Sequence, residues 1–249
     1  GVIESHTAAM LEPYSNNRKT RGETTIPPNR FRDLVAEVDK AGLQVWTHAI
    51  GDRGVRVALD AYEHALNQNG PHDARFRIEH IETIHPDDIP RFERLGVLAA
   101  MQPIHSDPGT VKVWSQAVGN QRLPYSFPWA SLEKAGATLV FGSDWPACYN
   151  NNPMRGLHIA VNRRTVEGEP AGGWLPEQRV TLETALKGFT RNGAYASFAE
   201  RSQGKLMPGY YADLIVLSAN PFEIKPMDLH TPTVEQTYFA GRQIYQKKR

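Results

Sequence analysis

The sequence is poor in several features that would assign it to particular classes of protein. Its only cysteine, Cys148, excludes an intrachain disulfide and favours a reducing, cytoplasmic compartment, although a disulfide-free secreted protein would have the same composition. No stretch reaches the roughly 18 apolar residues of a membrane span, and the first residues have neither the basic flank nor the apolar core of a signal peptide. With a net charge of +1 and scattered Lys and Arg, the chain has no basic tract for nucleic acid. We therefore expect neither membrane nor nucleic acid as a partner.

What is present is the composition of a soluble globular protein. The chain is 40% hydrophobic and 22% charged, which leaves enough apolar material for one sizeable core. Neither a low-complexity tract nor an internal repeat beyond alternating helix and strand patterns is visible. These features predict an ordered domain rather than a disordered chain.

Helical and strand patterns alternate along the first part of the sequence. In "NRFRDLVAEVDKAG", Phe31, Leu34, Val35 and Val38 share one helical face, and the pattern stops at Gly42. Short apolar runs follow such helices. The predicted helices cover residues 29–42, 54–66, 85–96 and 126–136, and the predicted strands cover 43–48, 75–80, 97–102 and 137–144. Four strands joined by short helical crossovers predict parallel pairing in an α/β sheet that is buried on both faces.

The composition changes toward the C-terminus. Residues 154–164 and 181–198 have helical periods, whereas residues 204–221 and 233–246 resemble strands, and an Ala-Gly pair in the latter predicts a hairpin. We therefore expect a small β appendage from about residue 204 onward.

Three predicted strands end on a side chain that binds metals. His48 closes "QVWTH", His80 closes "RFRIEH", and Asp144 follows "LVFGS". The carboxyl ends of parallel strands converge on one face of the sheet, and two imidazoles with a carboxylate suit a divalent metal such as Zn²⁺. The alternative for each residue alone is a polar strand end that bonds to nearby backbone. Three such residues at strand ends favour a shared metal site.

At this point the sequence resembles a family. "VWTHAIGDRGVRVALDAYEHA", "RFRIEHIETIHPDDIPRFERLGVLAAMQPIHSD", "GATLVFGSDWPA", "GKLMPGYYADLIVLSANPF" and "TYFAGRQIY" are similar to the metal-dependent amidohydrolase superfamily, in the N-substituted formamide deformylase-like, exoenzyme-like branch. The resemblance implies strands five to eight of a distorted (β/α)₈ barrel in residues 1–203 and part of a β-sandwich in 204–249. His48, His80 and Asp144 would bind metal, most simply Zn²⁺, with one or two ions in a complete enzyme.

The resemblance also implies a reaction and further site residues. A metal-activated water would cleave a non-peptide C–N amide bond of a small-molecule substrate, and Asp144 would carry the proton to the leaving nitrogen. Gln102 and His105, in "MQPIHSD", would contact the substrate, although His105 could instead be a solvated loop residue. Asp52 is expected to cap the following helix, or else to orient His48.

The sequence lacks other parts of the superfamily pattern. It has neither the His-x-His pair of the first strand nor the lysine or glutamate of the fourth, and it opens on Gly1 rather than Met. The opening "GVIESHTAAMLEPY" resembles the segment after the fourth strand, so we expect a C-terminal half. Such a half should associate with the missing N-terminal half or with itself. It should also bind Zn²⁺ loosely and hydrolyse amides weakly when alone. The alternative function is a non-catalytic half-barrel or interaction module with an incomplete metal site.

Overall fold

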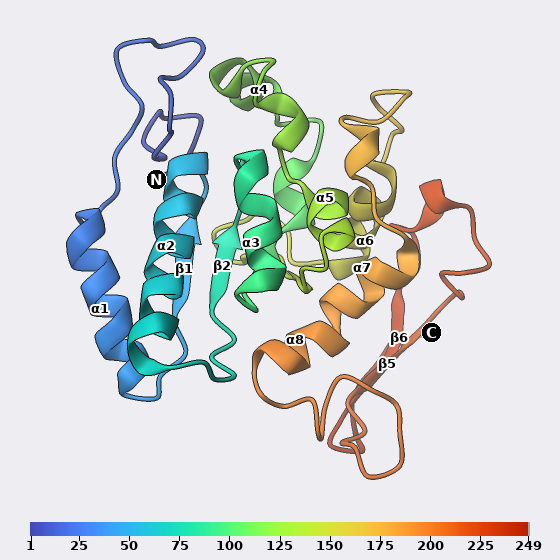
Figure 1. Cartoon of the computed structure of the whole chain (residues 1–249). Helices are drawn as coiled ribbons and strands as arrows, with labels where there is room; N and C mark the ends of the chain where they lie inside the picture. The colour runs from blue at the N-terminus through green and yellow to red at the C-terminus, as the bar shows by residue number, and fades with distance from the viewer. Residues whose placement is uncertain (249) are drawn as a thin grey trace. The chain divides into compact units, whose positions relative to one another are not determined.

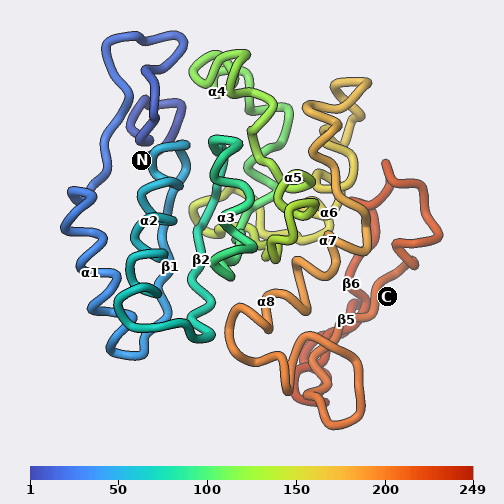
Figure 2. The backbone as a smooth tube through the Cα atoms, viewed as in Figure 1, coloured from blue at the N-terminus to red at the C-terminus, as the bar shows by residue number. Residues whose placement is uncertain are grey.

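The computed structural model of the chain describes residues 1–248. The backbone divides into two compact units. The first unit comprises Gly1–Met101 and Gly109–Leu139, and the second comprises Gln102–Pro108 and the chain from Val140 onward. Figure 1 labels the elements and Figure 2 traces the backbone through them.

The core of the first unit is a parallel sheet. Strand β1 (Trp46–Ala49) pairs in parallel with β2 (Arg77–His80), and β2 pairs in parallel with β3 (Leu98–Met101). Ala99 of β3 donates its N–H to the carbonyl of Thr138 (3.0 Å), just before the next strand begins. The alternation of helix and strand in the sequence therefore predicted the element order and the parallel pairing of β1 to β3 correctly.

Helix α2 packs on β1, and α1 packs against α2 (Figures 1 and 2). Helix α1 begins with a proline, where a missing N–H has no consequence, and the chain leaves it through Gly42, whose φ is +76°. The helical elements of the first unit are α1 (Pro28–Lys40), α2 (Asp52–Asn69), η1 (Pro86–Asp88), α3 (Ile89–Arg94), α4 (Lys112–Val118), η3 (Leu123–Tyr125) and α5 (Trp129–Lys134). Among residues 1–248 no helix is long and apolar enough to span a membrane.

Tyr62 joins α2 to the two strands that carry histidines. Its ring stacks on Phe76 with centroids 4.5 Å apart, and its hydroxyl donates to the carbonyl of Arg77 (2.8 Å) and forms a second hydrogen bond with the hydroxyl of Thr47. Complete burial raises the pKa of this phenol, so the hydroxyl remains a donor. The contact fixes α2 against the start of β2 and the middle of β1.

The second unit combines short helices with an antiparallel sheet. Strand β6 pairs with both β5 and β7, and the predicted turn at Ala240 and Gly241 is confirmed, with φ values of +49° and +77°. Its elements are η2 (Pro103–Ser106), β4 (Leu139–Phe141, whose first residue belongs to the first unit), α6 (Pro153–Asn162), η4 (Pro176–Gln178), α7 (Leu182–Phe189), α8 (Arg191–Ala196), β5 (Leu214–Leu217), η5 (Pro226–Asp228), β6 (Val234–Phe239) and β7 (Arg242–Gln246). The β5–β7 sheet lies within the expected appendage, whose boundary at residue 204 stays a prediction.

Two local expectations are wrong. The single helix expected over residues 181–198 is broken at Thr190, whose backbone adopts φ −130° and ψ −88° while its hydroxyl donates to the carbonyl of Leu186 (2.7 Å). Asp52 is not the N-cap of α2, because Gly51 occupies that position. The Asp52 carboxylate instead accepts from the backbone N–H groups of Leu11 and Arg53 (both 2.8 Å), so it anchors the N-terminal loop and does not orient His48.

Candidate metal centre

Two histidines meet at the carboxyl ends of β1 and β2. His80 is the last residue of β2, and His48 is the third of the four residues of β1. Their ring centroids lie 4.4 Å apart at an interplanar angle of 66°. His48 is exposed and donates from Nε2 to the carbonyl of Gly1 (3.1 Å), which leaves its lone pair on Nδ1. The first unit therefore brings together two of the three residues expected to bind metal.

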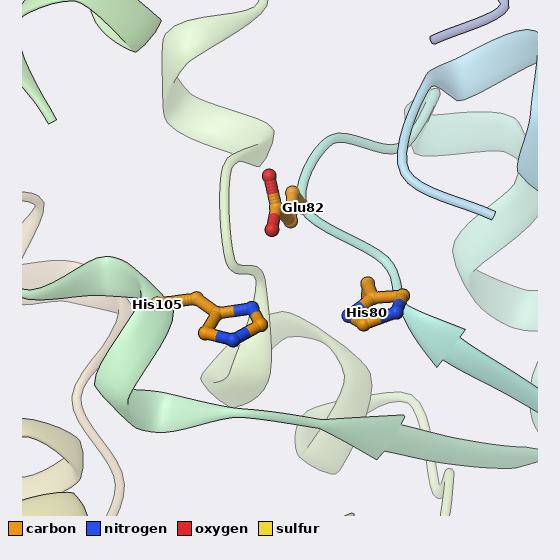
Figure 3. Close-up of side chains that lie close together, drawn as sticks. All are labelled: His80, Glu82 and His105. Carbon is orange, nitrogen blue, oxygen red and sulfur yellow. The ribbon is translucent and has the colours of Figure 1, made fainter. Parts of the chain in front are cut away.

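The chain turns sharply after β2. His80 and Ile81 both have positive φ, +80° and +50°, and a β-branched residue is seldom found in that region. The turn is followed by Glu82, whose buried carboxylate accepts from the indole N–H of Trp114 (3.1 Å). A carboxylate oxygen of Glu82 lies within 4.8 Å of a ring nitrogen of His80. Figure 3 shows His80 at the tip of β2 and Glu82 in the loop after it.

Sequence reasoning missed Glu82. The signal was the spacing "HIE", which puts an acidic residue two positions after the strand-end histidine. Alternation along an extended chain places residues i and i+2 on the same side. That spacing alone is common, and only the structure shows that the carboxylate is buried.

The second unit brings His105 and Asp144 together. His105 lies on η2, as Figure 3 shows, and Asp144 follows β4 by three residues. The Nε2 atom of His105 is 3.7 Å from Oδ2 of Asp144, and the two side chains are 20% and 38% exposed. Asp144 has φ +58°, and its carbonyl accepts from the N–H of Cys148 (3.0 Å). A carboxylate and an imidazole at this distance can share or pass a proton through a small movement.

A buried ion pair supports the turn that carries His105. Asp107, directly after η2, accepts from Arg155 of α6 (2.8 Å) and from the hydroxyl of Tyr149 (3.2 Å). The hydrogen bond to Asp107 raises the pKa of the Arg155 guanidinium, because it stabilises the charged form. Gln102 is the buried N-cap residue of η2. The contacts of Asp107 thus anchor the C-terminal end of the η2 turn.

Trp145 and Tyr149 follow Asp144 in the chain. Their exposed fractions are 63% and 64%, so they are not core residues. Burial of part of the ring and the neighbouring Asp107 raise the pKa of Tyr149, which keeps its hydroxyl protonated as the donor to that carboxylate.

Comparison with known proteins identifies the family of this chain. A profile described as "Amidohydrolase family" matches residues 1–245. The chain belongs to the amidohydrolase family. The resemblance seen in the sequence motifs is therefore confirmed.

Relatives within the amidohydrolase family cover almost all of this chain. Protein LONG AFTER FAR-RED 3 from Arabidopsis thaliana is 33% identical over 98% of the chain and 41% of its own length. N-substituted formamide deformylase from Arthrobacter pascens is 29% identical over 99% of the chain and 45% of its own length. The crystal structure of an uncharacterized metal-dependent hydrolase from Pyrococcus horikoshii matches with a TM-score of 0.78 at 29% identity, over 91% of this chain and 44% of that one. The chain spans less than half the length of these relatives.

The residues of the first unit fit a divalent metal by their chemistry. Two imidazoles in contact offer nitrogen ligands, and the neighbouring carboxylate of Glu82 offers oxygen. Nitrogen and carboxylate ligands of this kind suit zinc and similar ions. If the two rings met only as part of a packed core, both would be buried. His48 is exposed, so core packing does not explain the contact.

Proposed function

We propose that this chain is the C-terminal part of a metal-dependent hydrolase that cleaves a non-peptide C–N amide bond of a small molecule. The observation that carries the proposal is the contact between the His48 and His80 rings at the carboxyl ends of adjacent parallel strands, in a member of the amidohydrolase family. One relative is named N-substituted formamide deformylase, which supports an amide or formamide substrate.

The metal ligands of this proposal are His48, His80 and Asp144, and the ion is zinc or a similar divalent cation. When bound, such an ion lowers the pKa of a water ligand toward 7 and polarises the substrate carbonyl. The chain supplies two neutral nitrogen donors and one negative oxygen donor, which is the combination found in catalytic zinc sites.

The remaining steps fall to side chains of this chain. In the proposal, the Asp144 carboxylate accepts a proton from the attacking water and delivers it to the leaving nitrogen, because a positioned carboxylate can act first as a general base and then as a general acid. His105, whose Nε2 lies 3.7 Å from Asp144, contacts the substrate. Gln102, at the start of the same η2 turn, is the second substrate contact.

We extend the proposal to the assembly and the compartment. The parallel strands are strands five to eight of a (β/α)₈ barrel, and β1 offers an edge for another strand, beside which Leu43 and Trp46 are 61% and 54% exposed. The relatives are more than twice as long as the match, which supports a partner in the form of the N-terminal half of the barrel. Self-association is the alternative, and the single cysteine supports a cytoplasmic location.

The test is co-expression of the 249-residue chain with the N-terminal half of its barrel, followed by assays on N-formyl and N-acyl amines. We expect amide hydrolysis that disappears with a chelator and returns with Zn²⁺. His48→Ala, His80→Ala and Asp144→Asn should each reduce activity by at least about 100-fold, whereas His64→Ala on α2 should not change it.

The chain alone should be oligomeric in light scattering and should hydrolyse these amides weakly. Full activity in the presence of a chelator would refute the metal-dependent mechanism. An assembly that binds metal but hydrolyses none of the amides would favour the non-catalytic interaction module instead.

A further inference from the structure

We propose that Glu82 is a further metal ligand, which binds the ion together with His80. The inference rests on the proposed function, because it assumes a metal at the end of β2. The residues expected from the sequence did not include Glu82, and the first unit would otherwise offer only imidazoles to the ion.

The backbone places Glu82 beside His80. Two successive residues with positive φ, His80 and Ile81, reverse the direction of the chain at the end of β2. As a result a carboxylate oxygen of Glu82 comes within 4.8 Å of a ring nitrogen of His80 (Figure 3). A divalent ion about 2 Å from each of two ligand atoms can bridge atoms that are up to about 4 Å apart, so a small side-chain rotation suffices. Strained backbone of this kind is concentrated at functional sites.

The surroundings hold the carboxylate in position. Trp114 of α4 is 1% exposed and donates its indole N–H to Oε2 of Glu82 (3.1 Å). The carbonyl of Glu82 accepts from the N–H of Phe127 (2.9 Å), so the backbone is fixed too. A carboxylate has two oxygens and about four acceptor positions, so it can accept a hydrogen bond and bind a cation at the same time. Carboxylates that bind metals are commonly held by such a second hydrogen bond.

Charge balance also favours Glu82 as a ligand. The two imidazoles are neutral, so carboxylates must offset the charge of a divalent ion, and Glu82 would add one negative charge to that of Asp144. Glu82 is only 7% exposed, and a buried carboxylate is stabilised by a cation within ligand distance. A purely structural role, as the acceptor for Trp114, is the competing explanation.

The Glu82→Gln variant separates the two roles. Glutamine keeps an oxygen that accepts the indole N–H, but it removes the negative charge. We would titrate Zn²⁺ into the metal-free 249-residue chain by calorimetry and use Co²⁺ absorption as a spectroscopic probe of the ligands. We expect Glu82→Gln to weaken Zn²⁺ binding by about 10- to 100-fold. The matched control, Glu79→Gln on β2, removes a carboxylate that is paired with Arg77 and should leave the affinity unchanged.

The outcomes distinguish this inference from the proposed function. If His80→Ala loses Zn²⁺ binding and Glu82→Gln binds as tightly as the parent, Glu82 is not a ligand but the metal site stands. If the parent and His80→Ala bind Zn²⁺ equally poorly, both proposals are wrong. Should circular dichroism show that Glu82→Gln is unfolded, Glu82→Asp decides: it keeps the charge but shortens the side chain by one methylene, and an undiminished affinity there would overturn the inference.

Discussion

The ion pair between Arg155 and Asp107 should contribute measurably to the stability of the second unit. Arg155 extends from the first turn of α6 to Asp107, which directly follows the turn that carries His105. The two side chains are 28% and 4% exposed, so water reaches the guanidinium but hardly reaches the carboxylate. Removal of Arg155 therefore leaves a buried negative charge with the Tyr149 hydroxyl as a remaining donor.

The size of the effect follows from this burial. Breaking a fully buried ion pair by removing one partner costs about 3–5 kcal/mol. Arg155 is partly exposed, and the hydrogen bond from Tyr149 remains, so we expect Arg155→Met to lower the free energy of unfolding by about 2 kcal/mol. Replacing both partners, in Arg155→Met with Asp107→Asn, should recover part of that loss, because no buried charge is then left unpaired.

Urea denaturation followed by circular dichroism measures these differences. For a slope of about 2 kcal/mol per molar urea, the Arg155→Met midpoint should fall by about 1 M. Lys187→Met is the matched control, since Lys187 pairs with Glu183 on the exposed side of α7 and should leave the midpoint unchanged. A double-mutant cycle in which the two substitutions are additive would show that the pair has no coupling energy and would refute this reasoning.

Three further predictions concern other contacts. Tyr62→Phe keeps the stacked ring but removes the hydroxyl that bonds to Arg77 and Thr47. In urea denaturation it should lower the free energy of unfolding by about 1–2 kcal/mol. An unchanged midpoint would contradict this role of Tyr62. Burial, and to a lesser degree the neighbouring His230, lowers the pKa of His158. The imidazole therefore binds a second proton more readily in the unfolded chain than in the folded one. The free energy of unfolding should fall as the pH drops below about 6.5. His158→Gln should flatten that slope in pH-dependent denaturation, and an equal slope in both proteins would count against the buried imidazole as its source. In Gly156→Ala the new Cβ would lie 2.6 Å from Cζ of Phe189, so we expect the free energy of unfolding to fall by about 1–3 kcal/mol. An unchanged melting temperature would show that the Phe189 ring moves aside without cost.

The sequence predicted the positions of β3 and β4 because they are apolar runs, whereas β1 and β2 are only partly buried. All residues of β3 and β4 are buried, as expected for runs of apolar residues between turns. The strand-end histidines were identified for the same reason, since a polar residue that closes an apolar run is conspicuous. The pairing of His48 with His80 then needed only parallel strands in adjacent positions.

Shorter elements were harder to predict. Helix α4, Lys112–Val118, is seven residues long, which is less than the window in which a helical period becomes visible. The break at Thr190 is equally local, because a period that continues on both sides gives no sign of a hydroxyl that bonds to the carbonyl of Leu186. The roles of Asp52 and Asp107 depend on partners 41 and 48 residues away in the chain, which no local pattern reveals.

Glu82 shows why a candidate ligand can be invisible in the sequence even when its spacing is favourable. Isoleucine is among the residues least suited to positive φ, so local preference predicts that the chain continues as a strand through Ile81. Tertiary packing overrules that preference, because Ile81 is completely buried and its N–H donates to the carbonyl of Ala49 (3.1 Å) on the neighbouring strand. Conflicts between local preference and native conformation are expected chiefly at functional sites. The positive φ of Ile81 thus lies at the end of β2, between His80 and Glu82, the two residues of this turn that we propose as metal ligands.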